Sequence, residues 1–426
     1  MPFIPFNNQY ATLGQSFYNE TRPSPVVKPE LIKFNDGLAD ELGLASTDLD
    51  SNDLTAIFSG NRLTEGSTPL AMAYAGHQFG NFVPQLGDGR AILLGDIATP
   101  DGDKFDVQLK GSGPTVYSRN GDGRAALGPV LREYLVSEAM SMLGVPTTRA
   151  LAVVTTGEEV VRERLIPGGV ITRVAQSFIR VGTFQYFSAR GDLDAVRKLA
   201  DYVIERNYPQ LRDAENPYVA LFKIVVDKQA ALIAQWMRLG FIHGVMNTDN
   251  MSIVGETIDY GPCAFLDEYK HDKVFSSIDR NGRYAYYNQP AIGLWNLTRL
   301  AECLAPLFSQ DEDNSVEVAK EILSDYQATY EQYWLENMLA KLGLSTDADK
   351  KIVEEDKVLI ESLLGLMERY QADFTLTFLY LSQVKPESAE QTSGKNSEFH
   401  ELFGNASQLD DWLNKWQRRL NHESLN

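Results

Sequence analysis

The sequence predicts an α+β protein with two lobes, a strand-rich first part and a helix-rich second part. Two observations carry this prediction. Between residues 91 and 164, short runs that alternate or are rich in β-branched residues are separated by turn-forming segments. Beyond residue 168 the composition becomes helical, with several long amphipathic segments. A chain of 426 residues is long enough for one large core or for two lobes with a cleft between them.

The first 80 residues are predicted to form an N-terminal extension that packs on the main body. They are rich in loops, with Pro23, Pro25 and Pro29, and then contain a short amphipathic stretch near Leu31–Leu44.

Residues 81–165 are predicted to form the strand-rich lobe. AILLGDI (Ala91–Ile97) and KFDVQLK (Lys104–Lys110) indicate two strands around the turn TPDGD. The second run places Asp106, Gln108 and Lys110 on one side and apolar residues on the other. Further elements are expected in order: a helix with proline in its first turn, Pro129–Leu143, and two strands around Gly157, Arg149–Thr155 and Val160–Arg164.

Residues 166–384 are predicted to form the helical lobe, followed by a linker and C-terminal segment, 385–426. The composition becomes helical after Gly168 and Gly169. Amphipathic patterns indicate helices over Asp192–Asn207, Val219–Leu239, Pro290–Leu307, Val316–Leu342 and Ile352–Gln383. Lys385–Ser397 is rich in Ser, Glu, Gln, Lys and Gly, which is typical of an exposed linker.

Charge and composition exclude several classes of partner. The formal net charge of −19 argues against nucleic acid or an anionic membrane as the main partner, because both require a basic face. The sequence has no apolar run of membrane-spanning length, and its N-terminus lacks the pattern of a signal peptide. With two cysteines, Cys263 and Cys303, the simplest expectation is a cytoplasmic protein. The five histidines are scattered, which argues against a zinc site.

The segment from His243 to Asn250, followed by Asp259-Tyr-Gly, has the outline of a kinase catalytic loop and metal-binding turn. A protein kinase places its base two residues after the histidine and its metal-binding asparagine seven residues after it. Here the seventh residue is Asn250, but the base position holds Val245, which cannot accept a proton. Asn250 and Asp259 offer the oxygen ligands that Mg²⁺ or Mn²⁺ prefers. The pattern therefore predicts metal and nucleotide binding without ordinary phosphoryl transfer.

Asp249 is the only carboxylate in this loop and is the candidate base. The alternative is that Asp249 and Asn250 only form a turn. His243 is expected to pack and hydrogen-bond the loop rather than to transfer protons.

A five-residue repeat, GDGRA, begins at Gly87 and again at Gly121. Glycines let backbone N–H groups approach a phosphate, and an arginine can reach it. The alternative is that the two segments are ordinary Asp-Gly turns. Gly87, Gly89 and Arg90 precede Lys110 by about twenty residues, where a kinase keeps its glycine-rich loop relative to its lysine.

Lys110 is the candidate cation for the nucleotide phosphates, with a solvated lysine at a strand end as the alternative. Glu133, 23 residues further on, can pair with Lys110, while Glu138 on the same predicted helix is the competing candidate. Arg173 and Arg180 could hold a terminal phosphate, or they could form surface ion pairs.

Several long blocks in order resemble the selenoprotein O family. These are GDGRA, QLKGSGPTVYSRNGDGRAALGPVLREYLVSEAM, GVITRVAQSFIRVGTFQ and HGVMNTDNMSIVGETIDYGPCAFLD, and they run from about Gly87 to Asp267. The family consists of proteins with a protein-kinase-like fold, once called pseudokinases, whose members act as protein adenylyltransferases. The resemblance implies that AMP is transferred from ATP to a Ser, Thr or Tyr hydroxyl of a protein, with release of pyrophosphate. Transfer of UMP from UTP is also known in the family.

The resemblance also implies roles for residues that match the family's motifs. ATP is expected to bind in a flipped orientation, so that its α-phosphate faces the acceptor. The reacting phosphorus then lies elsewhere than in a kinase, which explains why Val245 can replace the kinase base. Glu133 is expected to pair with Lys110, Asp249 to accept a proton, and Asn250 and Asp259 to bind Mg²⁺ or Mn²⁺. Contacts with the nucleotide are expected from Gly87, Gly89, Arg90, Lys110, Asp122, Gly123, Arg173, Arg180 and Asp259.

Family members commonly continue to a C-terminal cysteine or selenocysteine, whereas this sequence stops at NHESLN. Two alternatives stay open at this point: loss of control by a tail disulfide, and a truncated sequence. Two other functions fit parts of the pattern: a kinase that transfers the γ-phosphate with Asp249 as a displaced base, and a catalytically inactive nucleotide-binding scaffold. The complete set of Lys110, Glu133, Asn250 and Asp259 argues against the scaffold.

Overall fold

The computed structural model describes residues 3–44, 49–345, 350–384, 398–404 and 406–423. Helices and an antiparallel sheet together confirm the α+β class. The chain forms two compact units. The first comprises Met1–Lys228, Met246–Gly261 and Leu294–Ser324, and the second comprises Gln229–Val245, Pro262–Gly293 and Asp325–Asn426.

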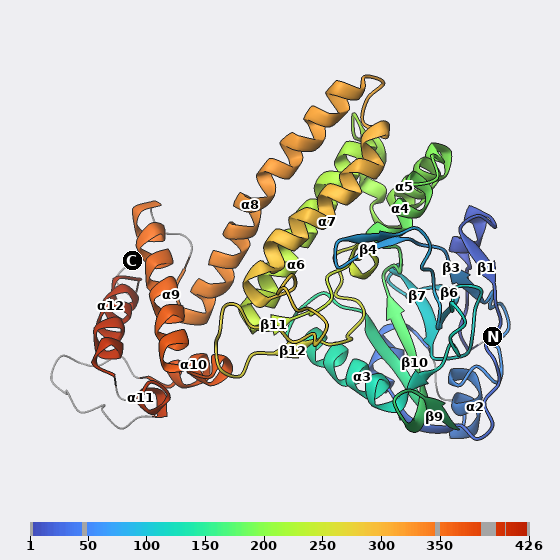
Figure 1. Ribbon diagram of the computed structural model, residues 1–426, viewed down its shortest axis with the longest axis horizontal. Helices are drawn as coiled ribbons and strands as arrows, with labels where there is room; N and C mark the ends of the chain where they lie inside the picture. The colour runs from blue at the N-terminus through green and yellow to red at the C-terminus, as the bar shows by residue number, and fades with distance from the viewer. Residues whose placement is uncertain (1–2, 45–48, 346–349, 385–397, 405, 424–426) are drawn as a thin grey trace. The chain divides into compact units, whose positions relative to one another are not determined.

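The first unit is built around an antiparallel sheet (Figure 1). Its strands, in spatial order, are β1 (Tyr18–Glu20), β3 (Leu70–Met72), β6 (Ala91–Ala98), β7 (Lys104–Lys110), β10 (Leu165–Ala175), β9 (Arg149–Val161) and β2 (Glu30–Phe34). The short β8 (Ala125–Ala126) pairs with β10. The predicted pair of strands around TPDGD is confirmed as β6 and β7.

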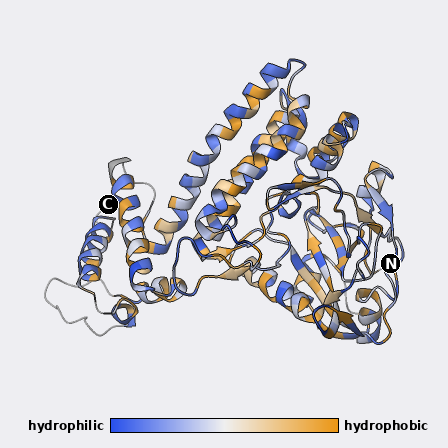
Figure 2. Ribbon diagram, in the orientation of Figure 1, coloured by the Kyte–Doolittle hydropathy of each residue, from blue (hydrophilic) through white to orange (hydrophobic). Residues whose placement is uncertain are grey.

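Helices cover both faces of this sheet. Apolar residues of α1 (Asp36–Glu41) and α2 (Ser51–Phe58) join the core on one face, where Leu38 and Phe58 pack with Val107 and Leu151. The helix α3 (Leu127–Met142) packs on the other face, where Val130 contributes to a smaller cluster. Figure 2 shows apolar residues in the strands of this sheet and also in the helices. A sheet buried on both faces explains why even the polar side of β7 is removed from water.

Three predictions about local structure need correction. The first 80 residues are not merely loops, because β1, β2 and β3 belong to the sheet. Residues 149–161 form one continuous strand rather than two, because β9 pairs with β10 on both sides of Gly157. Residues 169–175 are not helical but belong to β10, which is hydrogen-bonded to β7 and to β9. The pairings of β10 with β7 and of β2 with β9 join segments that are distant in the chain, so local composition did not indicate them.

The helices that follow along the chain, from residue 181 to residue 342, largely match the prediction. The short α4 (Val181–Ser188) precedes α5 (Leu193–Asn207), and α6 (Pro217–Leu239) begins with proline in its first turn. The predicted Pro290–Leu307 helix is α7 (Gln289–Leu304) followed by a 3₁₀ turn (Ala305–Leu307), and Val316–Leu342 lies within α8 (Glu312–Leu342).

The second unit contains an antiparallel pair of short strands, β11 (Phe241–Ile242) and β12 (Ala264–Phe265), and the C-terminal helices. The predicted helix Ile352–Gln383 is two helices, α9 (Lys350–Tyr370) and α10 (Phe374–Leu381). The chain breaks at Asp373, whose carboxylate accepts a hydrogen bond from Leu376 N and so caps α10.

The remaining helices of the second unit are α11 (Glu398–Leu402) and α12 (Ser407–Glu423). The indole of Trp412 in α12 donates to the Leu359 carbonyl in α9 (2.9 Å). The predicted linker Lys385–Ser397 lies outside the described residues. In the part of the chain that is described, every helix is too short or too polar to cross a membrane.

Candidate active site

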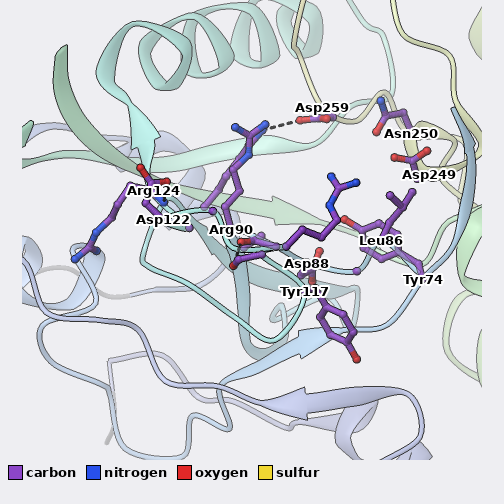
Figure 3. Close-up of a pocket in the computed structure, with 18 of the residues that line it drawn as sticks. Tyr74, Leu86, Asp88, Arg90, Tyr117, Asp122, Arg124, Asp249, Asn250 and Asp259 are labelled. Atoms are coloured by element: carbon purple, nitrogen blue, oxygen red, sulfur yellow. Dashed lines mark hydrogen bonds and ion pairs between the residues drawn. The ribbon is translucent and has the colours of Figure 1, made fainter. Parts of the chain in front are cut away.

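The predicted site residues meet in one cavity of about 620 Å³ within the first unit. Figure 3 draws Asp249, Asn250 and Asp259 along one side of this cavity. The predicted residues that line it are Gly87, Gly89, Arg90, Lys110, Asp122, Gly123, Arg173, Arg180, Asp249, Asn250 and Asp259. Glu133 lies behind them, in contact with Lys110.

Lys110, Glu133, Arg173 and Asp259 form a closed cluster of two cations and two carboxylates. Lys110 Nζ is 2.8 Å from Glu133 Oε2 and 2.6 Å from Asp259 Oδ1. Arg173 Nη2 is 2.9 Å from the same Asp259 oxygen, and Arg173 Nε is paired with Glu133 Oε1. Because each charge has two opposite neighbours, a buried cluster of this kind is stable only when complete.

This cluster decides between the alternatives for Lys110 and the helix glutamates. Lys110 is 8% exposed, so it is not a solvated lysine at a strand end. Glu138, the competing carboxylate of α3, is instead paired with Arg149 (2.8 Å). Arg173 is 4% exposed, so the alternative of an ion pair on the surface does not apply to it.

The cluster keeps both of its carboxyl groups ionised. Burial alone would raise the pKa of Glu133, but Arg173 and Lys110 outweigh it and lower this pKa below its usual value. Burial would likewise raise the pKa of Asp259. The charges of Lys110, Arg173 and Arg90 hold the Asp259 pKa well below the ordinary range.

Asn250 and Asp259 present oxygen donors to the cavity from two turns. Asn250 ends the 3₁₀ turn Thr248–Asn250, and Asp259 has a left-handed backbone (φ 68°) at the start of Asp-Tyr-Gly. An amide oxygen and an ionised carboxylate suit Mg²⁺ or Mn²⁺, so the donor set fits the predicted metal. A separate group, His271, Asp272 and Glu368, lies in the second unit with ligand atoms within 4.8 Å of one another.

Asp249 is held in a different environment from Asp259. It is 8% exposed, and its Oδ2 accepts a hydrogen bond from Gln78 Nε2 (3.2 Å). Arg180 Nη1 donates to its backbone carbonyl (3.1 Å). Burial raises the pKa of Asp249 to about 6, and the hydrogen bond from Gln78 and the charge of Arg180 oppose this rise.

Both GDGR segments line the cavity, and the chain between them ties them together. Thr115 Oγ1 donates to the Asp88 carbonyl (2.7 Å), and Ser118 Oγ donates to the Gly89 carbonyl. A Cβ at Gly87 would collide with the Tyr117 ring. Glycine is therefore required at Gly87 by the packing of Tyr117, a reason that the sequence pattern did not reveal.

The arginine of the second segment is held by hydrogen bonds. Arg124 also lines the cavity, and its guanidinium donates to the Ser24 and Pro25 carbonyls (both 3.1 Å). Asp122 is paired with Arg162 (2.8 Å), which sequence reasoning did not single out. Further lining residues that it missed include Tyr74, Gln78, Leu86, Asp88, Tyr117, Ser118, Arg119 and Val161. Apart from their closeness to the GDGR segments, the sequence carries no signal for them.

His243 has the packing role expected of it. It is 1% exposed, its backbone N–H donates to Gln289 Oε1 (3.0 Å), and its ring lies 5.4 Å from that of Trp236. Val245, at the position of the kinase base, donates its backbone N–H to His243 Nδ1 (3.3 Å).

Comparison with known proteins agrees with this geometry. The family model for protein adenylyltransferase SelO matches residues 3–426. The protein nucleotidyltransferase YdiU of Rhizobium rhizogenes (strain K84) is 57% identical over 99% of this chain and 82% of its own length. Proteins of the same name from Rhizobium meliloti (strain 1021) and Rhodopseudomonas palustris (strain BisB18) are 58% and 56% identical, covering 98% of this chain and 83% and 82% of their own lengths. The chain belongs to the protein adenylyltransferase SelO family.

Proposed function

We propose that this enzyme transfers AMP from ATP to Ser, Thr or Tyr hydroxyls of proteins and releases pyrophosphate. The observation that carries the proposal is the cavity in which Lys110, Arg173 and Arg180 lie beside Asp249, Asn250 and Asp259. Cations there can compensate the charge that develops on pyrophosphate, and a fixed geometry supplies much of the remaining rate.

In the proposed reaction the acceptor hydroxyl oxygen bonds to the α-phosphorus, and the bond from that phosphorus to the pyrophosphate oxygen breaks. Asp249 takes the hydroxyl proton. Lys110, Arg90 and the arginines Arg173 and Arg180 bind the phosphates. Asn250 and Asp259 would hold Mg²⁺ or Mn²⁺, which supplies further neutralisation of phosphate charge when bound.

The same proposal includes a protein-kinase-like arrangement of a strand-rich lobe, extended beyond residues 81–165 by β1, β2, β3 and β10 of the same sheet, and a helical lobe that follows it in the chain. It is supported by the order of glycine segment, lysine, helix glutamate, His243 loop and Asp-Tyr-Gly along the chain. We also propose a cytoplasmic location, because a sequence with only two cysteines, Cys263 and Cys303, is not a disulfide scaffold. The net charge of −19 is our reason for proposing protein rather than nucleic-acid or membrane partners. UTP is the alternative nucleotide to test.

Transfer of label from ATP tests the proposal. The pure protein would be incubated with Mg²⁺ or Mn²⁺ and a cell lysate, with ATP labelled at the α-phosphate or, in parallel, at the γ-phosphate. We expect protein-bound label only from the α-phosphate, and we expect Asp259→Ala to abolish it. Asp101→Ala, in the exposed turn between β6 and β7, is the matched control and should transfer label normally.

Label from the γ-phosphate alone would make the protein a kinase. Nucleotide binding without any transfer would favour the inactive scaffold. Both results contradict AMP transfer.

A further inference from the structure

A small hairpin outside the large sheet contacts the loop that carries Asp249. Its strands are β4 (Gly76–Gln78) and β5 (Asn81–Val83), and they pair only with each other among the described strands. The two turn residues, Phe79 (φ 51°) and Gly80 (φ 84°), both have left-handed backbones, as a tight two-residue hairpin turn requires. The turn fixes the register, and with it the direction of each side chain in β4.

Three residues lock the hairpin to the loop through a closed ring of hydrogen bonds. The backbone N–H of His77 donates to Thr248 Oγ1 (2.7 Å), and this hydroxyl donates to Gln185 Oε1 in α4 (2.6 Å). Gln185 Nε2 donates back to His77 Nδ1 (2.9 Å). Since Nδ1 accepts, the imidazole of His77 carries its proton on Nε2. The ring therefore fixes the backbone directly before Asp249.

A second contact fixes the Asp249 carboxylate itself. Gln78, the next residue along β4, donates from Nε2 to Asp249 Oδ2 (3.2 Å). The other oxygen, Oδ1, is buried and has no hydrogen-bond partner within the described protein. It lies against Gly76, where a Cβ would come within 2.6 Å of it. Both Gln78 and Asp249 line the cavity. This leaves Oδ2, which has a second lone pair, as the oxygen directed to the reaction.

We propose that Gln78 is a positioning residue that makes Oδ2 of Asp249 the atom that takes the proton from the acceptor hydroxyl. The proposal rests on AMP transfer as the function of the same site. In this step the hydroxyl O–H bond breaks, its proton moves to Oδ2, and its oxygen bonds to the α-phosphorus as pyrophosphate leaves. The ring of His77, Gln185 and Thr248 holds the backbone on which this arrangement depends.

Three variants test the proposal, with kcat, the KM for ATP and the thermal midpoint measured for each. Gln78→Leu keeps the size of the side chain and removes the donor. We expect it to lower kcat by about 10- to 100-fold, because a misplaced reacting group costs that much, while the KM for ATP and the thermal midpoint stay near wild type. Gln78→Glu should lower kcat further, because it sets a second carboxylate beside Asp249. Gln85→Leu, an exposed glutamine seven residues along, is the matched control and should behave as wild type.

A wild-type kcat in Gln78→Leu would overturn the proposal, and so would a loss of kcat explained by a lower thermal midpoint. Crystal structures of the wild-type protein and of Gln78→Leu provide a readout that does not depend on activity. We expect the Asp249 carboxylate to rotate in the variant, and an unchanged orientation would overturn the positioning role even if the wild-type protein transfers no AMP. Absence of AMP transfer in the wild type, by contrast, refutes the proposed function itself.

Discussion

Asp249 and Asp259 stand ten positions apart in the chain, line the same cavity, and have pKa values shifted in opposite directions. Asp259 is paired with Lys110 and Arg173, so it stays ionised and is suited to bind a cation. Asp249 is buried, and its hydrogen-bond donor is the neutral amide of Gln78. Burial raises the pKa of Asp249 to about 6, so its carboxylate is suited to accept a proton near neutral pH. Opposite shifts of two neighbouring acids are a means by which enzymes divide roles between identical side chains.

The raised pKa of Asp249 predicts the pH dependence of AMP transfer. A base must be deprotonated to act, so we expect kcat/KM to rise about tenfold per pH unit below a midpoint near 6 and to level off above pH 7. Asp249→Asn should bind ATP normally but transfer AMP at least about 100-fold more slowly at every pH. The measurement is the initial rate of α-label transfer between pH 5 and 8. A midpoint near pH 4, the ordinary range of an aspartate, would contradict the role of burial.

At the scale of elements, β7, β10 and α3 together build the charged cluster. Lys110 ends β7, Arg173 lies in the neighbouring strand β10, and Glu133 lies in the second turn of α3 on the same face of the sheet. Lys110, on the polar side of β7, is paired with Glu133 of α3, and Glu133 is also paired with Arg173 of β10. The alternation in KFDVQLK therefore marks a site rather than a solvent-facing edge.

Strand β4 packs closely against the loop that carries Asp249, so a methyl group added at Gly76 is expected to displace Asp249. In Gly76→Ala the new Cβ would lie 2.6 Å from Asp249 Oδ1 and 3.0 Å from its Cβ and Cγ, so the aspartate must move. We expect AMP transfer to fall at least tenfold and stability to fall by about 1–3 kcal/mol. Transfer assays and calorimetry would measure the two effects.

Gly128→Ala is the matched control for this change. Gly128 lies in the first turn of α3, and a Cβ there meets nothing within 4 Å. Equal activity of the two variants would show that the Asp249 loop tolerates the displacement.

At the scale of the whole first unit, buried charges connect the sheet to its helices. Arg206 in α5 is paired with Asp106 in β7 (2.6 Å) and Asp96 in β6 (3.2 Å), and all three are almost fully buried. Glu256 lies nearby in the fold, 6% exposed, and accepts a hydrogen bond from Gln176 N (3.1 Å). Burial raises the pKa of Glu256 to about 8, against 4.5 for an ordinary glutamate, and the charge of Asp106 adds to the rise.

Glu256 therefore predicts how the stability of the folded protein changes with pH. A folded state that holds a proton more tightly than the unfolded state loses stability as the pH rises from about 4.5 to about 8. A difference of about 3.5 pKa units corresponds to a loss on the order of 5 kcal/mol. Glu256→Gln keeps the acceptor for Gln176 N and removes this loss. Denaturant unfolding of both proteins at pH 5 and pH 8 should show the variant more stable at pH 8, with little difference at pH 5; equal stability at both would contradict the raised pKa.

The sequence alone determined the elements and residues that short-range patterns mark. Alternation identified β7 and its terminal Lys110, and the proline in the first turn identified α3. The spacing of His243, Asn250 and Asp259 identified the turns at the cavity. These succeed because periodicity and motif spacing reflect contacts between near neighbours in the chain.

Only the tertiary structure decided which of these side chains meet and which further residues join them. Arg173 reaches Glu133 because β10 pairs with β7, a pairing that no composition in residues 169–175 indicated. Gln78 and Asp249 are 171 residues apart, as are His77 and Thr248, yet each pair is hydrogen-bonded. Such contacts are specified by the packing of the whole unit, because the free energy that brings distant segments together comes from burying the core rather than from any local preference.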